Sequence, residues 1–165
     1  IEAMAAKRPD ILFLVYGGEP KDVSRCREKN SELPNMFFGG HISHPEAQKL
    51  MRCVDCLLMP YQISVSIGVK GHDTGRWMSP MKMFEYMAAG VPIISSDLPV
   101  LREILINEKN ALLVSPSDST KWCEALDRLI NNAELSNSIG KQAHLDYLEK
   151  YTWGARARAI ISLFD

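Results

Sequence analysis

Residues 79–97, SPMKMFEYMAAGVPIISSD, decide the fold. A serine and a proline open this stretch, and a ten-residue run of helix-forming residues follows from Pro80 to Ala89. Gly90 ends the run, because glycine commonly follows the last turn of a helix. The apolar residues that come next, from Val91 to Ile94, are typical of a short buried strand. The stretch therefore predicts a helix that leads into a strand of a parallel sheet.

The start of this helix has the features of an anion site. Ser79 can cap the helix and Pro80 suits its first position, which leaves free N–H groups at the positive end of the helix dipole. Lys82 adds a cation beside that end. Glu85 lies one turn after Met81 on the same face, where its carboxylate can accept hydrogen bonds from hydroxyl groups. A phosphate at the cap and a diol on the carboxylate would together suit a nucleotide.

The same run also supports a purely structural interpretation. Apolar residues recur in it at helical spacing, which predicts that most of the helix packs in a core whatever the function. Ordinary helix glutamates are far commoner than ligand-binding ones. Glu85 in a surface ion pair therefore stays open as the alternative.

The run from Lys82 to Pro99, which continues to Arg102-Glu103-Ile104, resembles the nucleotide-sugar-binding segment of retaining glycosyltransferases of the GT-B fold, in the glycosyltransferase group 1 family. The likeness is tight over this stretch and loose over the rest of the chain. It implies that the chain is the C-terminal, donor-binding domain of such an enzyme.

In that family the segment carries two glutamates with seven residues between them; the first contacts the donor sugar and the second the ribose hydroxyls. Glu85 matches the second, and Trp77 stands where the first would be. The resemblance therefore implies a ribose contact for Glu85. For the sugar, we expect Asp73 or the backbone around Met78 to supply the contact from the loop that also contains Trp77.

Composition and length describe an ordinary domain. The chain has 165 residues, 24% charged and 46% apolar, with a net charge of −1, which predicts one domain over residues 1–165. Balanced charges exclude a typical nucleic-acid partner. No apolar run approaches the roughly 20 residues of a membrane span, and no signal peptide opens the chain. Because the chain begins at Ile1 rather than methionine, we expect it to be a fragment of a longer protein. The resemblance implies that this protein is a two-domain enzyme, which we expect in the cytoplasm or at the inner face of the membrane.

Two glycine pairs follow predicted strands. Residues 11–16 form a continuous apolar run, typical of a strand buried on both faces of a parallel sheet, and Gly17-Gly18 follows it. A second strand over residues 35–38 ends at Gly39-Gly40. The resemblance implies that the Gly17-Gly18 loop lies near the nucleotide and that His41 and Ile42 contact the base through their main chain. A plain strand-to-helix turn and a solvent-exposed loop histidine are the alternatives.

The rest of the chain continues the alternation of strands and helices. Apolar spacing and cap residues predict strands over 55–59 and 111–114 and helices over 22–30, 45–52, 99–106, 118–130, 134–149 and 153–164. Ser43 or His44 would cap the helix over 45–52, and Ser117 or Asp118 the helix over 118–130. Residues 61–78 form a long loop, which we interpret as a lid around the sugar. The alternation predicts an α/β fold, a Rossmann-like three-layer sandwich around a parallel sheet.

Four cysteines raise the question of a metal. Cys53 and Cys56 form a Cys-x-x-Cys pair, and His41 and His44 precede it by about ten residues. Cys53 is predicted to follow a helix and Cys56 to begin a strand, whereas a zinc knuckle needs a tight turn and a redox pair begins a helix. Free, partly buried thiols in a reducing cytosol are the better interpretation, with no metal expected.

The first functional hypothesis is a donor-binding domain that holds UDP or GDP sugars for polysaccharide biosynthesis. The helix start and Lys82 would stabilise the departing diphosphate without a metal or cofactor, since the nucleotide sugar is itself the substrate. The acceptor site, and any peripheral membrane contact, would belong to a missing N-terminal domain, so the isolated chain is expected to bind nucleotide weakly and transfer nothing. The alternatives are a non-catalytic nucleotide-binding module, marked by Trp77, and a nucleotide-sugar epimerase of the same fold.

The resemblance also implies that the closing helix crosses to the other domain, with Trp153 covering the surface between them, whereas core packing is the default for an aromatic residue.

Overall fold

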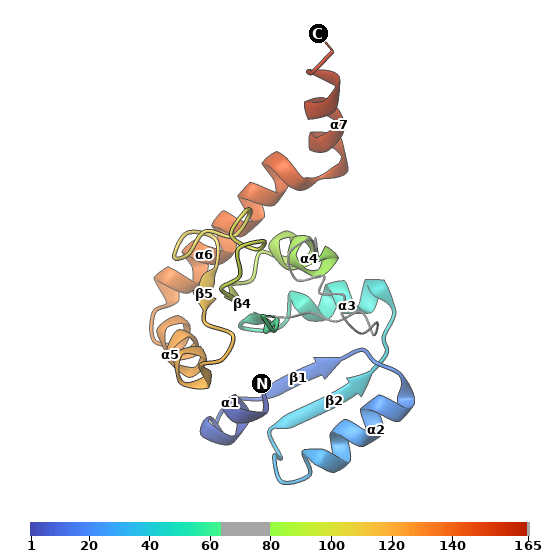
Figure 1. Ribbon diagram of the computed structural model, residues 1–165, viewed down its shortest axis with the longest axis vertical. Helices are drawn as coiled ribbons and strands as arrows, with labels where there is room; N and C mark the ends of the chain where they lie inside the picture. The colour runs from blue at the N-terminus through green and yellow to red at the C-terminus, as the bar shows by residue number, and fades with distance from the viewer. Residues whose placement is uncertain (64–79, 165) are drawn as a thin grey trace.

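The computed structural model describes residues 1–63 and 80–164 of the chain. Its elements, in chain order, are α1 (Glu2–Lys7), β1 (Phe13–Tyr16), α2 (Pro20–Lys29), β2 (Met36–Gly40), α3 (His44–Met51), β3 (Leu57–Met59), α4 (Met81–Ala89), β4 (Ile93–Ser96), β5 (Leu112–Val114), α5 (Ser119–Ile130), α6 (Ala133–Asp146), the π-helical turn η1 (Tyr147–Tyr151) and α7 (Trp153–Ile161). After β5 the chain is helical, and α7 extends away from the strands to the C-terminus (Figure 1).

Every strand pair in the described ranges is parallel. β1 pairs with β2, and β4 lies between β3 and β5, with Leu57 opposite Ile93 and Ile94 opposite Leu112. This pairing confirms the predicted Rossmann-like α/β class. The strands make two hydrogen-bonded sheets, β1-β2 and β3-β4-β5, where the sequence suggested one.

Two apolar clusters on opposite faces of β4 make the structure three-layered. Ile94 belongs to the cluster that contains Met4 of α1 and Trp122 of α5, whereas Ile93 belongs to the cluster that contains Met83 of α4. Successive side chains of a strand point to opposite faces, so adjacent isoleucines reach both clusters. Phe13 of β1 joins the first cluster and thereby connects the two sheets through one core.

Solvent reaches one face of β1, and the predicted burial on both faces is wrong there. Phe13 is buried, but Leu14 and Tyr16 are 37% and 38% exposed. Both lie on the face of the two-stranded sheet that also carries the half-exposed Phe37, whose ring centroid is 6.0 Å from that of Tyr16. Within the described residues β1 pairs with β2 alone.

Residues 99–106 are not the predicted helix but a series of turns. The Asn110 side chain bonds backbone groups at the end of this segment, where the turns leave them without a helical partner. Its amide donates to the carbonyl of Ile104 at 3.1 Å, and its oxygen accepts from the N–H of Ile106 at 2.7 Å. Before these turns, an ion pair joins Asp97 to Arg102 and lowers the pKa of the Asp97 carboxyl.

The helices after β5 begin at side-chain caps. Asp118 accepts hydrogen bonds from the N–H groups of Thr120 and Lys121, which confirms one of the two predicted caps of α5. The helix predicted over 134–149 ends as an α-helix at Asp146 and continues as η1. Within residues 1–63 and 80–164, the helices are too short or too polar to cross a bilayer.

Two glycines bring α6 against the end of α4. Gly90 follows α4 in the left-handed conformation, at φ 73°, as its predicted role at the helix end requires. A Cβ atom on Gly140 would lie 2.4 Å from the Gly90 carbonyl oxygen. One turn later, His144 Nδ1 lies 2.9 Å from the carbonyl oxygen of Ala88.

Gly140→Ala should therefore destabilise the chain. The added methyl group meets backbone that cannot yield, so we expect a loss of about 1–3 kcal/mol in the free energy of unfolding by urea. Gly154→Ala is the matched control, because a Cβ there meets only the flexible end of Arg158 at 3.5 Å. The control should be neutral or stabilising by up to about 1 kcal/mol. Equal urea midpoints for both variants would contradict the close contact.

Candidate functional site

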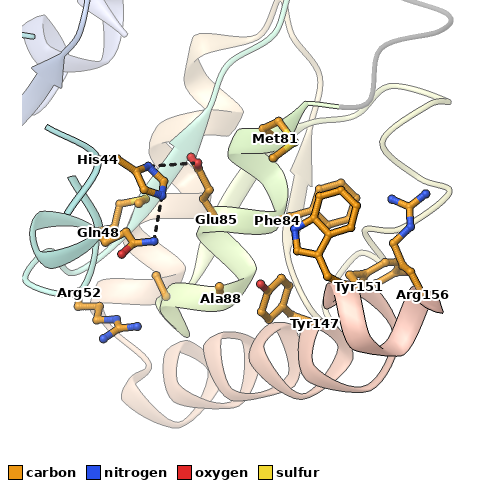
Figure 2. A pocket seen from close by; sticks show the side chains of 13 residues that line it. His44, Gln48, Arg52, Met81, Phe84, Glu85, Ala88, Tyr147, Tyr151 and Arg156 are labelled. Carbon is orange, nitrogen blue, oxygen red and sulfur yellow. Dashed lines mark hydrogen bonds and ion pairs between the residues drawn. The ribbon is translucent and has the colours of Figure 1, made fainter. Parts of the chain in front are cut away.

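A cavity of about 310 Å³ opens between α3, α4 and the C-terminal helical segments. Three stretches far apart in the sequence form its walls (Figure 2). The lining residues are His44, Gln48, Met51, Arg52, Met81, Phe84, Glu85, Ala88, Ala89, Tyr147, Tyr151, Trp153 and Arg156.

The wall between α3 and α4 is polar. Glu85 projects from α4 toward His44 on α3, and its Oε1 lies 3.7 Å from His44 Nδ1 (Figure 2). The other ring nitrogen of His44 lies 3.0 Å from the amide nitrogen of Gln48. The Glu85 side chain is 34% exposed, so its carboxylate remains accessible to a ligand.

The opposite wall is aromatic and carries a cation. The rings of Phe84 of α4 and Tyr151 of η1 are in contact, tilted by 48° with centroids 5.4 Å apart, and Arg156 of α7 lies beyond them (Figure 2). Trp153 also lines the cavity and is 81% exposed, so core packing, the default for an aromatic residue, is wrong here. The cavity thus offers a carboxylate on one side and flat apolar surfaces on the other.

Local sequence explains how α3 presents His44. Ser43 Oγ accepts the N–H of Glu46, and the Glu46 carboxylate accepts the N–H of Ser43 at 2.9 Å, which completes a capping box. Hydrogen bonds from Ser43 lower the pKa of the Glu46 carboxyl. His44 follows the cap directly and is held in the first turn of the helix.

The start of α4 differs from the prediction by one residue. Pro80, in extended backbone with φ −71° and ψ 119°, occupies the cap position, and Met81 begins the helix. Proline has no side-chain acceptor, so no side-chain hydrogen bond closes this end. The prediction that Ser79 caps the helix and Pro80 begins it is therefore wrong, and Ser79 itself lies outside the described residues.

The structure brings some of the predicted residues together. Met81 and Glu85 line the cavity on one face of α4, as their spacing predicted. Buried Met83 and Met87 fix this orientation, because they anchor the opposite face in the core. Lys82 is exposed beside the helix start and is not among the lining residues. The residues predicted to contact the sugar, Asp73, Trp77 and Met78, lie outside the described residues.

The two loops predicted to bind the base, at Gly17-Gly18 and at His41-Ile42, lie next to each other and do not line the cavity. Gly17 and Gly18 have φ of 110° and 83°, and the N–H of Gly17 donates to the Gly40 carbonyl at 2.7 Å. His41 is exposed and Ile42 half-buried just after that bond. These loops adjoin the carboxyl ends of β1 and β2, the edge at which open parallel sheets bind ligands.

Sequence reasoning missed two parts of the cavity. It considered His44 only as a helix cap or metal ligand, whereas the ring faces Glu85 from another helix. It did not predict that Tyr147, Tyr151 and Arg156 would reach α4. The apolar spacing after residue 146 was the available signal, but it does not say which helix the side chains face.

All four cysteines are free thiols. Cys53 is exposed and Cys56 partly buried, and burial raises the pKa of the Cys56 thiol to about 12. In the described part of the chain, no three histidine, cysteine or acidic side chains gather in a way that could hold a metal ion.

Solved structures show the fold. The chain superposes on Anabaena HepE in complex with UDP-glucose with a TM-score of 0.75 at 16% identity, covering 99% of this chain and 43% of that one. It also superposes on the C-terminal domain of a glycosyl transferase group 1 protein from Francisella tularensis, with a TM-score of 0.70 at 23% identity over 92% of this chain and 77% of that one. The fold is that of the C-terminal domain of GT-B glycosyltransferases.

Sequence comparison then identifies the family. The family model described as glycosyl transferases group 1 matches residues 1–132, and the chain belongs to this family. It is 24% identical to the O-antigen chain mannosyltransferase C of Escherichia coli over 162 residues, which are 97% of this chain and 41% of that protein. The chain spans less than half the length of the first curated relatives it matches.

The two cysteines near β3 should differ in reactivity. Only the thiolate is alkylated, and with a pKa of about 12 roughly one Cys56 thiol in ten thousand is ionised at pH 8. In the folded chain we expect iodoacetamide to label Cys53 within minutes and to spare Cys56, whereas both should react in urea. Peptide mass spectrometry reads out the two sites. Equal labelling of the folded chain would contradict the burial of Cys56.

Proposed function

We propose that this chain is the donor-binding domain of a nucleotide-sugar-dependent glycosyltransferase. The observation that carries the proposal is the Glu85 carboxylate, which projects from α4 into a cavity of about 310 Å³ and remains 34% exposed. The segment that holds it is the one on which the chain resembles the family's nucleotide-sugar site. The alternative of a purely structural Glu85 has the His44 contact in its favour, but it gives no reason for the open cavity.

In this proposal Glu85 binds the ribose. An ionised carboxylate accepts hydrogen bonds through both oxygens, so it can hold two neighbouring hydroxyl groups at once. Met83 and Met87, fully buried on the other side of α4, keep the glutamate at a fixed point of the cavity wall. A fixed ribose in turn fixes the position of the diphosphate that leaves during transfer.

The start of α4 receives the diphosphate. Its first N–H groups lack a side-chain cap, and the positive end of the helix dipole favours an anion there. Exposed Lys82 adds a mobile cation next to Pro80 and Met81. As the bond between the anomeric carbon and the diphosphate oxygen breaks, negative charge grows on that oxygen, and these groups stabilise it without a metal.

We assign the base and the sugar of the donor to two other parts of the chain. We assign the base to the loops at Gly17-Gly18 and His41-Ile42, whose glycines allow close approach of a ligand to the backbone. The sugar belongs with Asp73, Trp77 and Met78, on the strength of the sequence. Attack on the face from which the diphosphate departs gives retention at the anomeric carbon.

The complete enzyme requires a second domain. The chain spans 41% of the E. coli O-antigen mannosyltransferase, so we place the acceptor site in the remaining part of the protein. Residues 1–165 then act as one donor-binding domain that binds nucleotide but does not transfer sugar alone. The name of that relative favours polysaccharide biosynthesis, and the UDP-glucose held by HepE favours a nucleotide-sugar donor.

Trp77 supports a second candidate, a module that binds nucleotide without transfer. In place of a glutamate, an indole cannot accept hydrogen bonds from sugar hydroxyls. The complete protein separates the two candidates, because only an enzyme releases nucleoside diphosphate from a nucleotide sugar when an acceptor is supplied.

Glu85→Gln should weaken the binding of UDP or GDP. The amide keeps the size of the side chain but loses the charge that strengthens both hydrogen bonds, so we expect about a 10- to 100-fold loss in affinity. Isothermal titration calorimetry of the 165-residue chain measures it, and Glu124→Gln on the exposed face of α5 is the control. Unchanged affinity in Glu85→Gln would remove the ribose role and leave the glutamate structural.

Lys82→Met should act on the phosphates alone. We expect the affinity for the nucleoside diphosphate to fall about two- to fivefold and that for the nucleoside to stay unchanged, because an exposed charge contributes up to about 1 kcal/mol. Lys49→Met makes the same change of charge at an exposed residue of α3, outside the proposed diphosphate site. A loss in Lys49→Met of the same size would mean a general effect of net charge.

A further inference from the structure

The strongest unassigned feature is a row of three polar side chains that joins two helices. Gln48 and His44 lie one turn apart on α3, and Glu85 faces them from α4 (Figure 2). The amide nitrogen of Gln48 is 3.0 Å from His44 Nε2, and His44 Nδ1 is 3.7 Å from Glu85 Oε1. Neither the family segment around α4 nor the helix dipole accounts for this row.

Hydrogen-bond chemistry determines which atoms of the three side chains donate and which accept. With the Gln48 amide as donor, Nε2 of His44 is the acceptor, and the ring proton of the neutral imidazole then lies on Nδ1. That proton points toward the Glu85 carboxylate. The distance of 3.7 Å is longer than a hydrogen bond, and contacts of this length can tighten when a ligand binds.

The backbone around His44 is rigid enough for this task. The capping box between Ser43 and Glu46 fixes the first turn of α3, and α3 packs against α4. A glutamate side chain has several rotatable bonds, and ordering it at the moment of binding costs affinity. A neighbour that restricts the carboxylate in advance removes part of that cost.

We propose that His44 is a positioning residue for Glu85: it holds the carboxylate in the orientation that accepts both ribose hydroxyls, and it thereby sets the preference for ribonucleotides over 2′-deoxyribonucleotides. The inference rests on the proposed ribose role of Glu85. His44 itself touches the carboxylate rather than the reacting atoms. Because Nε2 of His44 accepts from Gln48, the ring proton stays on Nδ1, which faces Glu85.

The test compares UDP and GDP with their 2′-deoxy analogues by calorimetry on the 165-residue chain. The wild type should prefer the ribonucleotide by about tenfold or more, the usual effect of one hydrogen bond to a charged group. In His44→Ala this preference should fall about three- to tenfold. His44→Asn should restore most of it, because its side-chain amide can place a donor where Nδ1 stands.

His144→Gln is the matched control, since that histidine contacts the Ala88 carbonyl at the other end of α4. It should leave the preference at the wild-type value, whatever it does to stability. A merely structural role of His44 would weaken both nucleotides equally and keep their ratio, which would overturn the inference alone. A wild type without any preference for the ribonucleotide would overturn the ribose role of Glu85, and the inference with it.

Discussion

The burial of β4 from both sides is the constraint on which the rest of the structure depends. Ile93 and Ile94 are completely buried, one in each apolar cluster, and the next two residues, Ser95 and Ser96, are buried as well. The Ser96 hydroxyl remains satisfied because it donates to the Tyr61 carbonyl at 2.7 Å. A strand with no exposed face must be covered by helices on both sides, and this requirement places α4 on one face of the sheet.

The fold around β4 was predictable because its signals are local. The helical run, Gly90 and the apolar strand follow one another in the sequence, and each has a conformational reason for its place. The cap of α5 at Asp118 and the alternation of helices and strands were likewise predictable from short stretches of sequence. The same stretch placed Met81 and Glu85 on one face, where both now line the cavity.

What the sequence could not predict depends on contacts between distant segments. The turns over residues 99–106 end where the Asn110 side chain bonds Ile104 and Ile106, and no local pattern in the sequence predicts that contact. The exposure of Leu14 and Tyr16 on one face of the β1-β2 sheet likewise depends on how distant segments pack. His44 meets Glu85 only because α3 packs on α4, so its part in the cavity could not be found before the helices were placed.

The contact between Gly90 and Gly140 has a consequence for the tolerance of the cavity to change. α6 leads directly into η1, whose tyrosines form the aromatic wall, while α4 carries the carboxylate of the polar wall. The two backbones touch at a point that admits no Cβ atom. A side chain at Gly140 would therefore push apart the two helices that carry the opposite walls, so the shape of the cavity depends on two glycines that do not line it.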